Sequence, residues 1–195
     1  GDFVNAEKYA DQILSIVKNQ PFANYVKAMV RMESKDYTAA SEHAELALQN
    51  NFNSPNLSLV AGASAFYLKN YEKSYAHLNG LITFLPPDHF ARRMLVVSQL
   101  ELGIVDNVVD TVSGVEASTD ENAEFLSMLS YKLLEVGAYS EAKEIVNQVA
   151  KIDSTSPERN LREGVLKLML NDPSAMDNLK QAVALDPDLI KAELA

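Results

Sequence analysis

Histidine is the side chain best suited to metal binding and to proton transfer near neutral pH, and this chain has three, His43, His77 and His89. None of them stands with carboxylates at the spacing of a helical zinc site. His43 precedes Glu45 by two residues, but the cysteine pair of a zinc deaminase centre is missing. We therefore interpret the three histidines as surface or partly packed residues.

Other catalytic patterns are equally weak. No glycine-rich phosphate loop follows a predicted strand, and combinations of Ser, His and Asp arise by chance in a chain of 195 residues. Cysteine is absent, which excludes disulfides and thiolate metal sites but leaves the cellular compartment open. The sequence predicts a non-enzymatic protein with no catalytic residue, no metal site and no cofactor.

The charge balance is acidic, with a formal net charge of -10 and no basic tract. Such a chain is not expected to bind nucleic acid or an anionic membrane surface, because both attract clustered Lys and Arg. We interpret a segment without Lys or Arg as a solvated rim, and a contact for a basic partner or a divalent cation is the alternative. Its acidic residues are Glu101, Asp106, Asp110, Glu116, Asp120, Glu121 and Glu124.

A pair of amphipathic helices joined by a short turn recurs every 34 residues. The pattern is clearest in residues 123–156, where apolar residues recur at helical spacing on both sides of a turn at Gly137. Helix starts in this register are Pro21, Pro55, His89, Ala123 and Pro157, preceded by Gln20 and by the possible N-caps Ser54, Asp88, Asn122 and Ser156. We expect a half repeat over 1–20, repeats over 21–54, 55–88, 89–122, 123–156 and 157–189, and the start of a further helix over 190–195.

Small residues stand where the paired helices cross. The eighth position of each period holds Ala28, Gly62, Val96, Ser130 and Gly164, and the facing position holds Ala6, Ala40, Ser74, Val108, Ala142 and Ala175. Small residues on both sides permit a close approach of two helices. The pattern predicts eleven helices of about 11 to 17 residues each.

This arrangement of a small residue, a turn, an alanine and a closing Leu-Asp-Pro resembles the tetratricopeptide repeat (TPR), most plainly in residues 175–187. The resemblance covers the whole chain and implies an all-α superhelical solenoid of antiparallel helix pairs, forming a single array over 1–195. Lys35 and Lys69 replace the turn glycine of the family. In the third repeat Val96 faces Val108, and Gly114 interrupts the second helix, so we expect a short helix and a wide pair there.

A narrower resemblance is carried by residues 85–95, 99–103 and 185–193, which look like segments of the TPR-repeat lipoproteins of the PEP-CTERM protein-sorting system. That resemblance implies a periplasmic protein of the bacterial cell envelope, associated with exosortase and exopolysaccharide loci. It also implies a lipid anchor on an N-terminal cysteine outside this chain. A cytoplasmic location is the alternative.

The TPR resemblance also implies where a partner binds, because the first helices of a TPR array line its concave groove. Of the residues on that side, Met29, Leu59, Ala63 and Val97 are interpreted as packing between repeats. Aromatic and Arg side chains are typical of binding hot spots. The candidate partner-binding residues are therefore Phe22, Tyr25, Tyr67, Phe90, Arg93 and Tyr131. A clamp for chaperone C-terminal carboxylates is disfavoured, because only Arg93 is a cation at the corresponding groove positions.

The function predicted from the sequence is a protein-interaction scaffold, part of a larger TPR protein, in envelope protein sorting or exopolysaccharide assembly. A substrate-presenting TPR domain of a larger enzyme and a cytoplasmic adaptor are the alternatives. The predicted ligand is a protein or peptide, and membrane contact is expected only through an anchor outside the chain. Apolar residues at the two ends also predict end-to-end self-association; they are Ala6, Ala10, Ile13 and Val17 at one end and Leu179, Val183 and Leu189 at the other.

Overall fold

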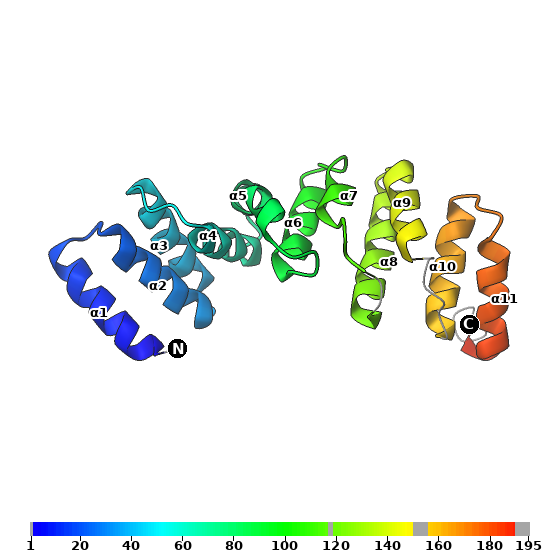
Figure 1. The fold of residues 1–195 in the computed structure, drawn as a ribbon, viewed down its shortest axis with the longest axis horizontal. Coiled ribbons are helices and arrows are strands. Elements are labelled where there is room, and N and C mark those ends of the chain that lie inside the picture. Colours follow the sequence, from blue (N-terminus) through cyan, green and yellow to red (C-terminus); the bar gives the residue numbers. More distant parts are fainter. Residues whose placement is uncertain (1, 117–118, 150–155, 190–195) are drawn as a thin grey trace. The chain divides into compact units, whose positions relative to one another are not determined.

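The computed structural model describes residues 2–116, 119–149 and 156–189, and all regular elements within these ranges are helical (Figure 1). Eleven α-helices lie in the described part of the chain, as predicted, together with one 3-10 helix, η1. Their bounds are α1 (Phe3–Ile16), α2 (Pro21–Glu33), α3 (Tyr37–Gln49), α4 (Pro55–Tyr67), α5 (Tyr71–Leu78), η1 (Asn79–Phe84), α6 (Phe90–Glu101), α7 (Val108–Thr111), α8 (Asp120–Glu135), α9 (Tyr139–Val149), α10 (Pro157–Met169) and α11 (Ala175–Leu185). The predicted all-α fold of consecutive antiparallel helix pairs is confirmed. The predicted helix after residue 189 lies outside the described residues.

The chain divides into two compact units, Gly1–Gly103 (the N-terminal unit) and Ile104–Ala195 (the C-terminal unit). In the N-terminal unit α2 packs against α3 and α4 against α5, and in the C-terminal unit α8 packs against α9 and α10 against α11. The first helix of each of these pairs is the longer or equal partner. The division into a single array of repeats stays a prediction. None of the helices among the described residues has the length and hydropathy needed to span a membrane.

The helix starts follow the predicted register at three of five places. Pro21, Pro55 and Pro157 are the first residues of their helices, and the Ser54 and Ser156 hydroxyls accept hydrogen bonds from the backbone N–H groups of Leu57 and Arg159. Two predicted N-caps, Asp88 and Asn122, are wrong.

The N-caps at those two places lie one residue later and three residues earlier. His89 caps α6, because its Nδ1 accepts from the Ala91 N–H at 3.2 Å. Thr119 caps α8, because its hydroxyl accepts from the Asn122 N–H at 3.2 Å. Asn122 therefore lies inside α8, and the predicted start at Ala123 is three residues too late.

The turns after the first helices require a left-handed backbone at one residue. Gly103 and Gly137 adopt it with φ of 71° and 80°, and Lys35 and Lys69 adopt it with φ of 61° and 58°. A side chain in this conformation crowds the following carbonyl and costs about 1 to 2 kcal/mol. The lysines at these places therefore reduce the stability of the N-terminal unit.

Replacing both lysines, Lys35→Gly and Lys69→Gly, is expected to stabilise the N-terminal unit by about 0.5 to 1 kcal/mol per site, after the greater freedom of unfolded glycine is subtracted. Urea unfolding measures the change. Lys8→Gly is the control, because Lys8 is exposed within α1 and glycine there should destabilise by about 1 kcal/mol. Equal losses at all three positions would contradict the prediction.

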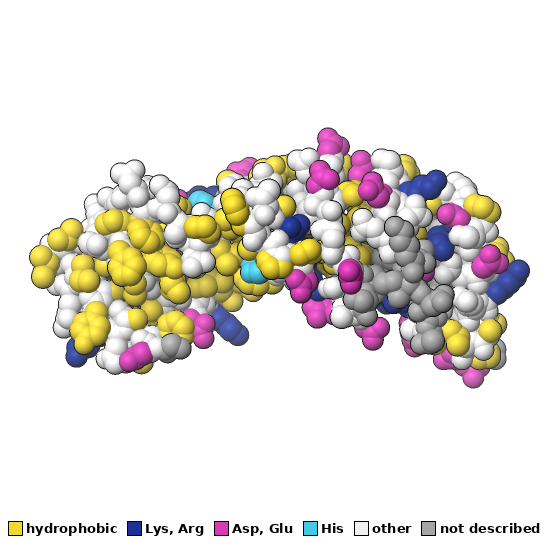
Figure 2. All heavy atoms as spheres, viewed as in Figure 1, with side chains coloured by type: hydrophobic (Ala, Val, Ile, Leu, Met, Phe, Trp, Pro, Cys, Tyr) yellow, Lys and Arg dark blue, Asp and Glu magenta, His cyan; other side chains and the backbone are white. Residues whose placement is uncertain are grey.

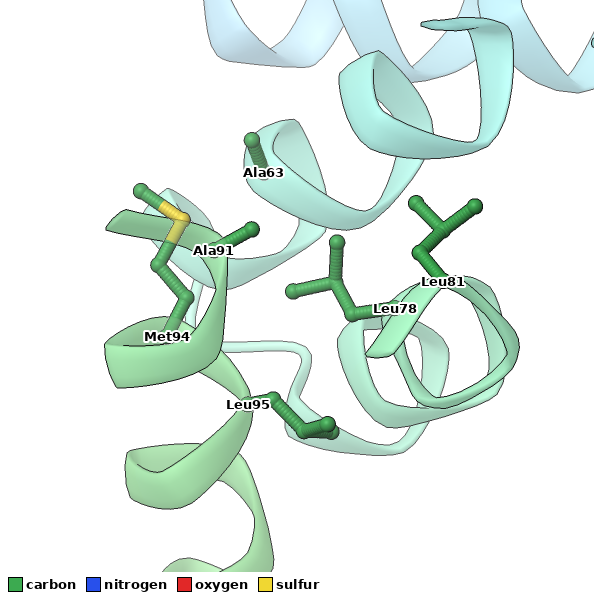
Figure 3. Packing of buried hydrophobic residues seen from close by; sticks show 6 residues of the cluster. All are labelled: Ala63, Leu78, Leu81, Ala91, Met94 and Leu95. Carbon is green, nitrogen blue, oxygen red and sulfur yellow. The ribbon is translucent and has the colours of Figure 1, made fainter. Parts of the chain in front are cut away.

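The small residues at the helix crossings are buried, as the repeat pattern predicted. Ala28 and Ala40 are fully buried in the first pair, and a Cβ added to Gly62 would lie 2.5 Å from Cγ of Leu78 in the second. Leu78 itself packs in a cluster with Leu81, Leu95 and other residues of α4, α6 and η1 (Figure 3). The absence of a side chain at position 62 therefore lets α5 lie directly on α4.

The third repeat is irregular, as its sequence predicted. Its second helix, α7, has only four residues, and the chain turns at Gly114 with φ of 80°. Val96 and Val108 are each buried within their own unit. The predicted wide separation of this helix pair joins the two units and stays a prediction, as does the predicted mobility of 113–119, of which 117 and 118 lie outside the described residues.

The two ends of the chain expose apolar side chains, in part those predicted. Ile13, Val17 and Val183 are exposed, whereas Ala10 is buried, which corrects the prediction for that residue. Ala6, Leu179 and Leu189 are half-buried. Figure 2 shows hydrophobic side chains gathered in a broad patch over α1 to α4 of the N-terminal unit. Self-association through the ends stays a prediction.

We expect the purified chain to associate with increasing concentration and Ile13→Glu with Val17→Glu to prevent this, because the carboxylates would be buried unpaired in the contact. Size-exclusion chromatography with light scattering measures the mass. Val136→Glu is the control, since Val136 is equally exposed but lies at the end of α8. A chain that stays monomeric at all concentrations would contradict the prediction.

Candidate peptide-binding groove

A groove of about 450 Å³ lies between α8 and α10 in the C-terminal unit. Most of its lining is apolar, and three side chains in its wall are unusually exposed: Met128 (62%), Tyr131 (48%) and Val165 (42%). Leu161 and Leu166 complete the apolar wall on α10, and Leu189 closes one side. This size and composition are those of sites that bind peptides and small molecules.

The two walls of the groove come from equivalent repeat positions. Ser127 and Tyr131 of α8 are separated by 34 residues from Leu161 and Val165 of α10. A helix presents residues four apart on one face, so each pair forms one rung of the groove. Both helices begin at a hydroxyl N-cap, Thr119 and Ser156, which fixes where the first turn starts.

Charged groups at the groove belong to three residues, Lys132, Glu158 and Arg162. The Lys132 ammonium pairs with Glu135 at 2.6 Å on the same helix. The Ser156 hydroxyl donates to Glu158 at 2.7 Å, and this hydrogen bond, with smaller help from a backbone bond and from Arg162, lowers the pKa of Glu158. Glu158 is therefore ionised at neutral pH.

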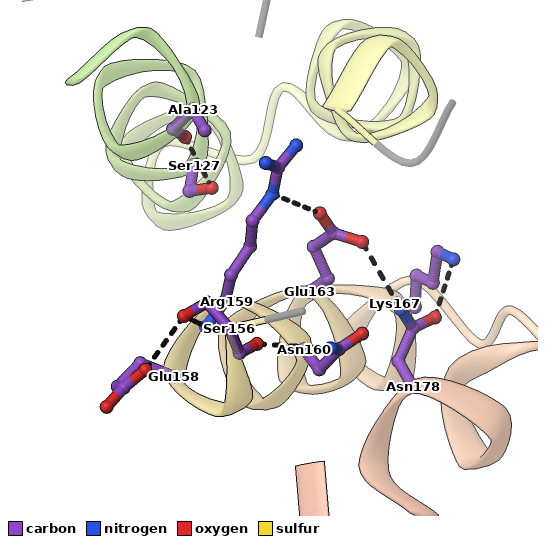
Figure 4. Close-up of polar contacts among 9 residues, drawn as sticks. All are labelled: Ala123, Ser127, Ser156, Glu158, Arg159, Asn160, Glu163, Lys167 and Asn178. Atoms are coloured by element: carbon purple, nitrogen blue, oxygen red, sulfur yellow. Dashed lines mark hydrogen bonds and ion pairs between the residues drawn. The ribbon is translucent and has the colours of Figure 1, made fainter. Parts of the chain in front are cut away.

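A buried polar network fixes α10 to α11 on a different side of α10 (Figure 4). Arg159 Nε lies 3.2 Å from Oε1 of Glu163, and Asn178 Nδ2 donates to Oε2 of Glu163 at 3.2 Å. Lys167 Nζ donates to Oδ1 of Asn178 at 2.7 Å. Because Glu163 and Lys167 are buried, these bonds hold α10 in one orientation and present Leu161 and Val165 to the groove.

Of the predicted partner-binding residues, Tyr131 lines this groove, together with Ser127, which the sequence placed on the same side. Tyr131 is half exposed, whereas Ser127 is buried and donates to the Ala123 carbonyl at 2.8 Å. Tyr131 is therefore the predicted residue that the groove makes available to a ligand.

Phe22 and Tyr25 form an aromatic cluster in the N-terminal unit. Their ring centroids are 6.1 Å apart, and Tyr25 stacks on Phe52 at 5.1 Å. Phe22 is exposed, but Tyr25 is half-buried against the core of α2, α3 and α4. Tyr25 therefore contributes to packing, and the binding role of both residues stays a prediction.

Tyr67 stacks on Tyr37, with ring centroids 4.2 Å apart and planes inclined by 14°. Both residues belong to the N-terminal unit, and Tyr67 is half exposed. The stack joins the end of α4 to the start of α3. Tyr67 is thus accessible on one ring face, and its binding role also stays a prediction.

Phe90 and Arg93 lie one turn apart at the start of α6. Phe90 is exposed and stacks on His89 at 4.5 Å, and Arg93 is half-buried. The neighbouring Arg92, which the sequence did not single out, is buried and donates to the carbonyls of Ile82 and Leu85 at 2.8 and 2.9 Å. Arg92 thereby satisfies the end of η1, and the role of Phe90 and Arg93 in binding stays a prediction.

Four groove residues were not chosen from the sequence: Met128, Leu161, Arg162 and Val165. Leu161 and Val165 occupy positions already recognised as facing the groove, but aliphatic residues there are more often packed between repeats. Met128 and Arg162 occupy the next repeat position, 34 residues apart, and that shared position is the sequence signal that could have identified them.

The histidines take part in polar contacts of the N-terminal unit. His43 Nδ1 lies 2.8 Å from Oδ1 of Asn24, and burial together with Lys27 and Arg31 lowers the pKa of His43. His77 Nε2 lies 3.2 Å from Glu45. Within the described ranges no three His, Asp or Glu side chains are grouped as metal ligands. The seven residues of the acidic segment are all exposed, as a solvated rim requires.

The fold of the chain is that of known TPR structures. The structure of YrrB, described as a TPR protein with an unusual peptide-binding site, matches with a TM-score of 0.64 over 95% of this chain and 98% of that chain, at 14% identity. MamA matches with a TM-score of 0.61 over 90% and 96%, at 14% identity. PilF of Pseudomonas aeruginosa matches with 0.53 over 99% and 90%, at 16% identity.

A sequence relative is the DnaJ homolog subfamily C member 7 homolog of Dictyostelium discoideum, which is 23% identical over 183 residues. The match covers 93% of this chain but 31% of that protein, so the chain spans about a third of its relative's length. No protein-family model matches the chain. At these identities the likeness to solved structures establishes the TPR fold.

Proposed function

We propose that the chain is a non-catalytic scaffold that binds an extended segment of a partner protein in the groove between α8 and α10. The observation that carries this proposal is the exposure of Met128, Tyr131 and Val165 around one cavity. Exposed apolar and aromatic side chains that converge on a concave site are typical of binding surfaces. The peptide-binding site named for YrrB, whose fold this chain shares, supports the same proposal.

The dimensions of the groove suit a short segment. Its wall on α10 runs from Glu158 to Leu166, which is about 12 Å at 1.5 Å per residue. An extended peptide advances about 3.3 Å per residue, so three to four residues would fill the groove. The occupant is therefore a local stretch of the partner with one or two apolar anchors.

The place of this scaffold in the cell is proposed from the sequence resemblance alone. Segments 85–95 and 185–193 support a periplasmic lipoprotein in envelope protein sorting or exopolysaccharide assembly. A cytoplasmic adaptor is the second candidate, supported by the match to a DnaJ homolog, and a substrate-presenting domain of a larger enzyme is the third. Cell fractionation and mass spectrometry of the native protein distinguish them, because the first requires a lipid-modified N-terminus.

The groove is tested by removing its apolar anchors. Peptides selected by the whole chain from a random decapeptide display library serve as ligands, and fluorescence anisotropy measures their affinity. The triple variant Met128→Ser, Tyr131→Ser and Val165→Ser is expected to weaken binding at least about a hundredfold, because each lost anchor contributes about 1 kcal/mol or more. Its helicity and melting should stay near wild type, since all three side chains are exposed.

A matched control replaces three equally exposed apolar residues outside the groove in the same unit, Leu168→Ser, Met169→Ser and Met176→Ser. This variant should bind as wild type does. The proposal fails if the two triple variants bind equally well, or if the library yields no peptide that the chain binds.

A further inference from the structure

Arg162 is a cation in the wall of an otherwise apolar groove. Among the described residues it interacts electrostatically with Glu158, four residues earlier on α10, but it forms no salt bridge. Its side chain is exposed. Nothing in the packing of α10 therefore requires a guanidinium at this position.

The other charged groups near Arg162 are engaged within their own helices. Lys132 pairs with Glu135, and Arg159 pairs with the buried Glu163. Glu158 accepts a hydrogen bond from Ser156. Arg162 is thus the groove cation whose donors remain available to a ligand, and a guanidinium offers two parallel N–H donors that match the two oxygens of a carboxylate.

We infer that the groove selects partner segments in which an Asp or Glu lies beside the apolar anchor, with Arg162 as the residue that sets this specificity. The inference rests on the proposed function, because it assigns the chemistry of the segment bound between α8 and α10. Met128, Tyr131 and Val165 hold the anchor, and the Arg162 guanidinium receives the carboxylate.

The spacing on α10 fixes how close the acidic residue lies to the anchor. Arg162 and Val165 are three residues apart, about 4.5 Å along the helix axis. One or two residues of an extended peptide, at about 3.3 Å each, cover that distance. The acidic side chain therefore follows or precedes the anchor by one or two positions.

The overall charge of the chain does not favour this selection. With a net charge of -10 the chain repels an acidic peptide at long range, so any preference for Asp or Glu has to come from a contact within the groove. A preference of this kind would also distinguish the contact at Arg162 from a general attraction, which would select basic peptides.

The same decapeptide display library, selected in parallel on the wild-type chain and on Arg162→Gln, tests the inference. Wild type is expected to enrich peptides with Asp or Glu one or two positions from an apolar residue. Arg162→Gln should keep the apolar preference and lose the acidic one. The consensus peptide from the wild-type selection should bind Arg162→Gln about tenfold more weakly, and Arg162→Lys, which keeps the charge without the fork, should lie between the two.

Lys180→Gln is the matched control, because it removes the same charge from an exposed position on α11 and should change the affinity by less than about twofold. Apolar enrichment without an acidic preference, or an acidic preference that Arg162→Gln retains, overturns the inference and leaves the groove as the site. A selection that yields no binding peptide, or peptides unaffected by loss of Met128, Tyr131 and Val165, overturns the proposed function as well.

Discussion

Gly62→Ala is expected to lower the free energy of unfolding of the N-terminal unit by about 1 to 3 kcal/mol. The sign is informative, because alanine in a helix interior normally stabilises by about 1 kcal/mol relative to glycine. The new Cβ would lie 2.5 Å from Cγ and Cδ2 of Leu78 and 3.3 Å from Cβ of His77. Leu78 is fully buried in its cluster and has no free space to move into, so α5 has to shift away from α4.

Gly80→Ala is the control, since no atom lies within 4 Å of a Cβ added there. That variant should unfold at the same denaturant concentration as wild type or at a higher one. A double-mutant cycle with Leu78→Ala adds a second check: truncating Leu78 removes the clash, so the two losses should sum to more than the double variant shows. Additive losses would show that Gly62 acts through something other than contact with Leu78.

The repeat period was the part of the fold that the sequence determined well. A stack of helix pairs depends on contacts between neighbours, so a 34-residue pattern of small and apolar residues specifies the number and pairing of helices directly. Glycine at 62 and 164 illustrates this, because each lies against a leucine of the facing helix. The pattern also predicted that the second helix of the third repeat would be short, as α7 is.

Helix boundaries were less predictable where two residues compete to cap a helix. At the start of α8 both Thr119 and Asn122 can accept a hydrogen bond, and the register favoured Asn122. The Thr119 hydroxyl takes the cap instead, which adds three residues to the helix. The choice depends on the backbone of the preceding loop, which the repeat pattern does not encode.

The candidate site was predicted by position but only partly by residue. The sequence identified the groove side of the first helices and favoured aromatic residues, which selected Tyr131 and also the packed Tyr25. Exposure separates these two, and exposure depends on what the neighbouring repeat contributes. Phe52 covers Tyr25 from the loop before α4, whereas no aromatic residue stacks on Tyr131 among the contacts of the described residues.

The seventh position of the repeat was the least predictable. It holds Ala61, Leu95 and Leu129 in the middle of the chain but Lys27 and Glu163 near its ends. In both of the latter cases a buried charge bonds to a neighbouring helix: Lys27 lies 2.8 Å from Glu7 and from Asp11 of α1, and Glu163 bonds to Asn178 of α11. Partners so distant in the sequence carry no local pattern, so the sequence indicated neither network.

Glu163→Ala is expected to destabilise the C-terminal unit by about 3 to 5 kcal/mol, because removing one member of a buried charged network leaves the others without compensation. Arg159 would lose its ion pair, and the Asn178 amide would lose its acceptor, both in surroundings where Glu163 is only 2% exposed. Thermal and urea unfolding measure the loss. It should persist in 0.5 M NaCl, since buried pairs are poorly screened.

Glu158→Ala removes the same charge from the same helix but at an exposed position, where the carboxylate bonds only to Ser156 among its described side-chain partners. Its cost is expected to stay below about 1 kcal/mol. The comparison therefore separates the buried network from the general effect of removing a carboxylate from α10. If both variants lose the same small amount, Glu163 does not hold α10 against α11, and the orientation of Leu161 and Val165 toward the groove has to come from apolar packing instead.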